Sequence, residues 1–331
     1  MSLETEVRSR LDLLTKPQGS LGKLEELALR YCLIRGSAMP PFTHKTMFVF
    51  CADHGVTEEG VSPYPAEVTG QMVENFLSGG AAINVLCRHG GIETRIVDMG
   101  VRKDTPPPVI QEKIGRGTHN FTREPAMTRE QAERALETGM RLARGARDSD
   151  AIGAGEMGIG NSTAAAALFS AFTGRDPAET AGRGTGVDDA GLERKIGAIR
   201  RALTLHRPDP ADPIGVLAAV GGFEIGAIAG LILGAAEIGR PVMLDGFICC
   251  SAALIARALS ARSLECALFS HRSAERGHRA LLSALNAQPL LDLDMRLGEG
   301  TGAALGIYLL EAAMKLYREM ATFGDAGVAR R

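Results

Sequence analysis

The chain has 331 residues, of which 45% are hydrophobic, 5% aromatic and 23% charged, and it holds 40 glycines and no tryptophan. This length predicts roughly two domains, or one large α/β domain with an appendage, and a core that needs no disulfide or metal. The formal net charge is only −2 and no basic stripe accumulates, which argues against a nucleic-acid partner.

The two ends of the chain are helical in pattern. Within the first 35 residues, Pro17 and Gly19 interrupt two helical stretches. The opening residues include acidic side chains and no apolar run, so we expect no signal peptide. We expect residues 1–40 and 303–331 to form a small helical subdomain beside a large α/β nucleotide-binding catalytic domain, residues 41–302.

Short apolar runs alternate with helical stretches between these ends. The predicted strands lie within residues 45–55, 92–101, 149–160, 240–247 and 264–271. The predicted helices include a pair within residues 69–91, and others within 125–146, 161–174 and 247–259. Thr128 and Gln131 form a capping-box signature. The apolar stretch 225–236 is too short to span a bilayer, and a buried helix is expected there. The alternation predicts a doubly wound, mostly parallel, Rossmann-like sheet with helices on both faces.

Polar or glycine-rich sequences follow the predicted strands. They are ADHG (52–55), GAGEMGIGNST (153–163), LDGF (244–247), SHRSAERGH (270–278) and GEGTGA (298–303). The carboxyl ends of parallel strands share one edge of a sheet, where ligands bind. These loops therefore predict a single site.

The run GAGEMG (153–158) matches the G-x-G-x-x-G spacing of dinucleotide-binding folds, so an NAD-dependent oxidoreductase is one alternative. Two features oppose it. The helix pattern starts only after the glycines, with a cap expected within residues 161–163. The acidic residue required about 20 residues later has only Asp176 to supply it, in a predicted turn. A turn without any ligand would leave the buried-looking Glu156 unexplained.

A second glycine-rich loop, GRGTGVDDAGLERK (182–195), can present backbone N–H groups and Lys195 to a phosphate. It does not match the P-loop motif. A plain loop with a solvated lysine is the alternative interpretation.

The cysteines show no C-x-x-C spacing and mostly lie in apolar runs, as reduced thiols of a cytoplasmic protein do. Asp53 and His54 imitate a metal pair but have no third ligand at a useful spacing, so we expect no metal. We interpret His54, His271 and His278 as polar packing or positioning groups, with a catalytic histidine as the less favoured alternative.

Long motifs along nearly the whole chain resemble the nicotinate-nucleotide–dimethylbenzimidazole phosphoribosyltransferase family. They include TKPQGSLGKLEELA, EGVSPYPAEVTGQMVENFLSGGAAINVL, GEMGIGNSTAAAAL, GRGTGVDDAGLERK, LDGFICCSAALIA, SHRSAERGH and DLDMRLGEGTGAALG. The resemblance implies transfer of the phosphoribosyl group of nicotinate mononucleotide to 5,6-dimethylbenzimidazole in cobalamin lower-ligand synthesis, without a cofactor, by a cytoplasmic homodimer. A non-catalytic nucleotide-binding protein on the same fold is a further alternative, which the presence of Glu299 opposes.

The resemblance also implies the roles of individual residues. Glu299 is the implied general base, because burial in a glycine-lined loop raises the pKa of a carboxyl; an acid favoured by a nearby helix start is the alternative. Glu156 is implied near the ribose, either as a second acid or base or as a holder of ribose hydroxyls. The implied substrate-binding residues are Ser62 and Gln71 for benzimidazole, Gly186 and Lys195 for phosphate, Asp245 and Ser273 for ribose or nucleotide, and also Gly158, Gly184 and Thr185.

Overall fold

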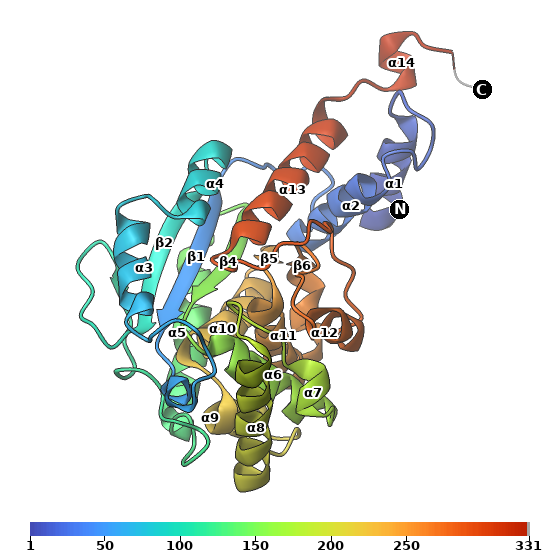
Figure 1. Cartoon of the computed structure of the whole chain (residues 1–331). Coiled ribbons are helices and arrows are strands. Elements are labelled where there is room, and N and C mark those ends of the chain that lie inside the picture. Colours follow the sequence, from blue (N-terminus) through green and yellow to red (C-terminus); the bar gives the residue numbers. More distant parts are fainter. Residues whose placement is uncertain (330–331) are drawn as a thin grey trace.

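The computed structural model describes residues 1–329, and within them one six-stranded sheet has the order β3-β2-β1-β4-β5-β6 (Figure 1). All neighbouring strands are parallel. The strands are β1 (Lys45–Ala52), β2 (Glu93–Gly100), β3 (Ile110–Gln111), β4 (Ala151–Met157), β5 (Val242–Leu244) and β6 (Ala267–Phe269). This is the doubly wound order, in which the sheet first grows one way from β1 and then the other way from β4. The predicted parallel α/β sheet is confirmed.

Helices cover both faces of the sheet. Strand β1 has apolar side chains on both faces, and each set must be buried under helices. Phe48 and Phe50 enter one core, while Met47 and Val49 enter the other. The first core lies under α5 (Arg129–Gly145), α6 (Asn161–Thr173), α9 (Pro213–Val220), α10 (Phe223–Glu237) and α11 (Phe247–Leu259). The second lies under α1 (Leu3–Leu13), α2 (Lys23–Arg35), α3 (Val68–Leu77), α4 (Ala82–Gly90) and α13 (Thr301–Glu319). Helices α8 (Asp189–His206) and α12 (His278–Ala284) also pack on the first core, through residues such as Ile199 and Leu281, and the two shortest helices are α7 (Pro177–Thr180) and α14 (Phe323–Ala326).

The helix starts show one confirmed prediction and one error. Thr128 and Gln131 form the predicted capping box at the start of α5. The cap of α6 is not a polar residue of 161–163 but Gly160, whose φ of 96° places it in the left-handed region. Glycine adopts that conformation without strain. As a result Asn161 becomes the first helical residue, and its side chain does not cap the helix.

The terminal helices meet along α13. The Arg10 guanidinium donates to the carbonyl of Tyr317 at 3.0 Å, and Thr15 N–H donates to the carbonyl of Ala321 at 3.0 Å. The first turns of α13 instead pack on the sheet, where Ala303 and Ile307 belong to the second core, with Met47 and Val49 of β1. The division into residues 1–40 plus 303–331 and residues 41–302 stays a prediction. Residues 330 and 331 lie outside the described part of the chain.

The apolar stretch 225–236 belongs to α10, which is a buried helix as expected. Within the described residues, no helix is both long and apolar enough to cross a membrane. Helix α10 contacts α5 through glycines on both helices. A Cβ on Gly139 would lie 1.9 Å from the carbonyl oxygen of Ala227, and one on Gly230 would lie 2.0 Å from that of Leu136. Backbone atoms cannot rotate away as side chains do, so only glycine permits this helix spacing.

We therefore expect Gly139→Ala to lower the free energy of unfolding by about 1–3 kcal/mol or more, as overpacking of a core does. Urea unfolding measures the change. The matched control is Gly145→Ala at the end of the same helix, where an added Cβ meets nothing within 4 Å. The control should keep or slightly raise stability, and equal stability of the two variants would contradict the packing argument.

Candidate active site

A pocket opens at the carboxyl edge of the sheet, where four of the five predicted loops converge; residues 52–55 do not line it. Its walls come from five segments: residues between 156 and 162, residues 184 and 185, residues 246–248, residues between 271 and 275, and residues 296–298. The predicted site residues that line it are Glu156, Gly158, Gly184, Thr185 and Ser273. A larger hollow lies between α2 and the segment after α12, lined by residues such as Lys23 and Gln288, away from the strand-end loops. The polar loops therefore single out the smaller pocket.

The other predicted residues are not part of the pocket lining. Ser62 approaches it, with its Oγ 3.4 Å from Oγ1 of Thr185. Gln71 is exposed on α3, and Gly186 is exposed in the 182–188 loop. Lys195, Asp245 and Glu299 are buried behind the walls.

Glu299 occupies an unusual backbone conformation directly beside the pocket. Its φ is 64°, between Gly298 at 87° and Gly300 at 96°. Left-handed backbone at a residue other than glycine costs about 1–3 kcal/mol and concentrates at functional sites. The Glu299 side chain is 6% exposed, and its Oε2 accepts a hydrogen bond from Ile83 N–H at 3.3 Å, in the first turn of α4. Burial raises the pKa of Glu299, the Ile83 N–H opposes the rise, and the nearby Asp245 charge adds to it.

The glycine run of β4 makes room for the loop that carries Glu299. A Cβ on Gly155 would lie 2.4 Å from the carbonyl oxygen of Glu299, and one on Gly153 would lie 2.7 Å from the sulfur of Met47. Both glycines lie inside the strand, and the helix begins only at Asn161. The run thus serves close packing, whereas a dinucleotide fingerprint requires a turn into a helix at that place.

Asp245, after β5, holds the same loop from behind. Its Oδ2 accepts from Gly300 N–H at 3.0 Å, and its Oδ1 accepts from Gly302 at 2.7 Å and Ala303 at 3.3 Å. These donors lie at the N-terminus of α13, where a carboxylate is favoured. Burial raises the pKa of Asp245 to about 7, and the backbone donors work against that rise. The contacts give Asp245 an anchoring role, while its predicted contact with ribose stays a prediction.

Glu156 is the next-to-last residue of β4 and forms part of the pocket wall. It is 6% exposed, and its Oε2 accepts a hydrogen bond from the side-chain amide of Asn161. Its Oε1 lies beside Gly298, only 2.6 Å from where a Cβ on that glycine would be. Burial, strengthened by the charge of Asp245, raises the pKa of Glu156 to about 8. The carboxyl is therefore protonated at neutral pH.

Lys195 lies on α8 and is 1% exposed, so the alternative of a solvated lysine is wrong. Its Nζ donates to Ser162 Oγ at 2.8 Å and to the carbonyl of Gly182 at 3.2 Å. Burial lowers its pKa to about 8, against the charge of Glu275. A Cβ on Gly184 would lie 3.0 Å from this ammonium group, so the glycine loop passes directly over it.

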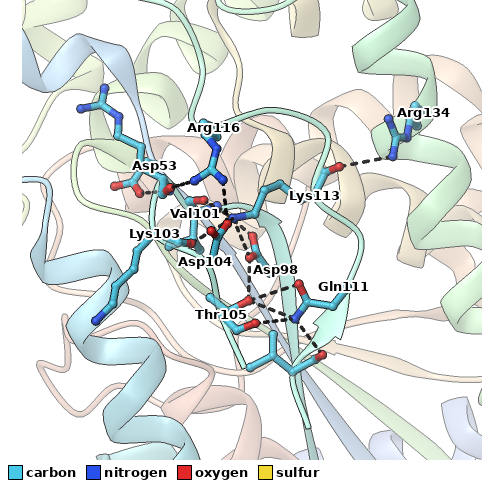
Figure 2. A network of polar contacts seen from close by, with 12 residues as sticks. Asp53, Asp98, Val101, Lys103, Asp104, Thr105, Gln111, Lys113, Arg116 and Arg134 are labelled. Carbon is cyan, nitrogen blue, oxygen red and sulfur yellow. Dashed lines mark hydrogen bonds and ion pairs between the residues drawn. The ribbon is translucent and has the colours of Figure 1, made fainter. Parts of the chain in front are cut away.

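Asp53 and His54, which imitate a metal pair in the sequence, are used internally. Asp53 Oδ2 accepts from Arg102 N–H at 2.7 Å, and His54 Nε2 lies 2.7 Å from Glu224 Oε1 with both side chains fully buried. Figure 2 shows the network around Asp53, in which Lys113 joins buried Asp98 to the loop after β2. These contacts fix the loops after β1 and β2, in agreement with a packing role for His54.

Sequence reasoning missed two polar residues of this region. Asn161 was considered only as a helix cap, yet it bonds to Glu156. Glu224 was considered only as the boundary of the apolar stretch 225–236, although a single acid at the start of an apolar helix is a recognisable signal. It contributes to the raised pKa of Glu156.

The comparisons with known proteins agree with this geometry. A family model described as phosphoribosyltransferase matches residues 1–328. A protein of Chloroflexus aggregans named nicotinate-nucleotide–dimethylbenzimidazole phosphoribosyltransferase is 54% identical over 99% of this chain and 94% of its own length. One with the same name in Geobacter metallireducens is 53% identical with the same coverage. The crystal structure of CobT from Thermus thermophilus superposes with a TM-score of 0.95 at 47% identity, over 99% of both chains. The chain therefore belongs to the nicotinate-nucleotide–dimethylbenzimidazole phosphoribosyltransferase family.

Proposed function

We propose that this protein transfers the 5-phosphoribosyl group of nicotinate mononucleotide to 5,6-dimethylbenzimidazole. The products are nicotinate and α-ribazole 5′-phosphate, the lower-ligand precursor of cobalamin. The names of the relatives supply the substrate pair. The structural observation that carries the proposal is the buried carboxyl of Glu299, held in a left-handed loop beside the strand-end pocket.

The reaction asks for a base and little else. An acceptor ring nitrogen attacks the anomeric carbon as the bond to nicotinate breaks, with inversion at that carbon. The bonding electron pair moves onto the nicotinate ring nitrogen, so the leaving group needs no proton. The proton on the other acceptor nitrogen must leave, and Glu299 takes it. A pKa raised by burial makes this carboxylate a stronger base than an exposed glutamate.

Glu156 has a different part. With a pKa of about 8 it is protonated at neutral pH and donates a hydrogen bond, so it holds a ribose oxygen rather than acting as a second base. The two glutamates of the site thus lie in different environments, a common arrangement where two carboxyl groups take different roles.

The remaining predicted residues divide between the two substrates. Gly184, Thr185 and Gly186 offer the phosphate a glycine-rich loop, and Lys195 lies under that loop as its counter-charge. Gly158 and Ser273 line the pocket and suit the ribose. Ser62 and Gln71 are assigned to the benzimidazole; Ser62 lies within reach of Thr185, whereas Gln71 rests on the resemblance alone.

We also propose a cytoplasmic homodimer. Leu293 and Leu297 are 53% and 60% exposed, and Leu297 borders the pocket. Apolar side chains exposed beside a site suit a protein interface. The six cysteines are all free and buried, which suits a reducing compartment.

Mixing the protein with nicotinate mononucleotide and dimethylbenzimidazole should release nicotinate, and none should appear without the acceptor.

Glu299→Gln keeps the shape of the side chain but cannot take the proton, so kcat should fall by about 10²–10⁴ with little change in fold stability. The wild-type rate should fall on the acid side as Glu299 protonates, at a pH above the ordinary glutamate pKa, because burial raises it.

Glu156→Gln is the control for that assignment. Its loss should be smaller and should appear partly in KM for the nucleotide. Near-normal kcat in Glu299→Gln, or an acid limb abolished by Glu156→Gln alone, would move the base to Glu156.

Lys195→Ala should raise KM for nicotinate mononucleotide more than it lowers kcat. The phosphate carries the same charge in the ground and transition states, so its binding is uniform. Nicotinate riboside lacks the phosphate and should respond little to the substitution. An equal loss with the riboside would show that Lys195 serves only to hold the Ser162 and Gly182 contacts.

The mass in solution checks the dimer. Light scattering at micromolar concentration should give twice the 35.0 kDa chain mass. Leu297→Glu should shift the mass toward the monomer, whereas Leu205→Glu, at a leucine that is also exposed but lies on α8, should not. A monomer for the wild-type protein would defeat the proposal.

A further inference from the structure

Asn161 is a polar side chain with no role in the fold's local geometry. It is the first residue of α6, after the cap Gly160, and its side chain does not cap the helix. It is nevertheless 6% exposed and lines the pocket. Its amide donates to Oε2 of Glu156. Alanine would suit this helix position at least as well. The contact with Glu156 is therefore what explains a buried amide here.

The contact acts on only one oxygen of the Glu156 carboxyl. Oε2 accepts the Asn161 N–H, whereas Oε1 lies against Gly298, another residue of the pocket lining. In a neutral carboxyl the oxygen that accepts an N–H is the carbonyl oxygen, so the proton resides on the other one. The Asn161 amide therefore fixes which of the two oxygens faces Gly298 and the pocket.

We propose that Asn161 is a positioning residue that keeps Oε2 of Glu156 as the accepting oxygen and directs the carboxyl proton through Oε1 into the pocket. The inference rests on the proposed function, because it gives Glu156 its direction toward the substrate. The proposal also states what a substitution at position 161 should do. A residue without a side-chain N–H leaves the carboxyl proton of Glu156 free to sit on either oxygen.

Several titratable groups face Glu156 from the elements around it, and a test must leave these residues unsubstituted. They are Cys51 of β1, His54 after β1, Glu224 of α10, Asp245 after β5, Cys249 of α11, His271 and Glu275 after β6, and Arg296 and Glu299 before α13. None of these is altered when Asn161 is replaced. An N–H donated to a carboxylate favours its ionised form, so removal of the donor raises the pKa of Glu156 above its present value of about 8.

The first experiment follows that titration directly, without activity. Carbon-13 NMR of the protein labelled at glutamate carboxyls, with the Glu156 signal identified by its loss in Glu156→Gln, gives the midpoint in the wild-type protein and in Asn161→Ala. The midpoint should move to higher pH in Asn161→Ala. The matched control is Ser162→Ala, one residue away, whose hydroxyl binds Lys195 and not Glu156; it should leave the midpoint in place. An unchanged midpoint in Asn161→Ala overturns the proposal.

The second experiment follows the reaction. In Asn161→Ala, kcat/KM for nicotinate mononucleotide should fall on the order of 2- to 10-fold, the effect of one hydrogen bond between neutral groups. The basic limb of its pH profile should move to higher pH, since activity needs the protonated Glu156. The shift must vanish when Glu156→Gln is combined with Asn161→Ala, which separates it from the titration of Lys195.

Asn161→Asp covers the case in which Asn161→Ala does not fold. It keeps the side-chain shape, removes the donor and adds a charge, so the midpoint of Glu156 should rise at least as far. A shift of the pH profile that persists in the Glu156→Gln background overturns the proposal. If the wild-type protein releases no nicotinate, the proposed function fails, and the NMR midpoint still decides the role of Asn161.

Discussion

The close approach of residues 298–300 to strand β4 sets the geometry of the whole site. The carbonyl oxygen of Glu299 occupies the space that a side chain on Gly155 would need. Glycine weakens a strand because it has no side chain to pack, but β4 is paired on both sides, with β1 and β5, and the loop itself fills the space left over. Asp245 then bonds the loop to the edge of the sheet through three backbone N–H groups. The packing on Gly155 and the hydrogen bonds to Asp245 thus hold the loop that carries Glu299 in place.

The same packing gathers carboxyl groups that would repel one another if all were ionised. Glu156 is largely buried, and the charges of Asp245, Glu224 and Glu299 add to the rise of its pKa. The backbone donors on Asp245 and the Ile83 N–H on Glu299 favour the ionised forms of these two groups. Glu156 has only the Asn161 amide, and it has the pKa of about 8. The proton therefore rests on the group with the least support for its charge.

The sequence was sufficient to predict five of the six strands and the edge that carries the site, because apolar runs followed by polar loops are local signals. The two-residue edge strand β3 was not predicted. Glu156 and Glu299 were recognisable as acids within glycine-rich loops, although their roles came from the resemblance. The contacts that orient them were not predictable. Gly155 was interpreted as part of a possible ligand turn, since nothing near it in the chain reveals residue 299 as its neighbour. Lys195 looked as much like a surface residue as a buried one, because its partners Ser162 and Gly182 come from other elements. Asn161 looked like a helix cap, because the sequence does not reveal that Gly160 adopts a left-handed conformation and takes the cap position itself.

Burial has an effect on catalysis here that a more open site would lack. A proton taken from the acceptor nitrogen must stay on its base while the new bond forms, and an exposed glutamate, with a pKa near 4.3, is a weak base at neutral pH. The fold removes Glu299 from water, which raises its pKa, but offers it the N-terminus of α4, which limits the rise. The carboxyl is thus more basic than an exposed one, while the Ile83 N–H limits the rise of its pKa. Glu156, one loop away, has no helix end to favour its charge, and burial raises its pKa to about 8.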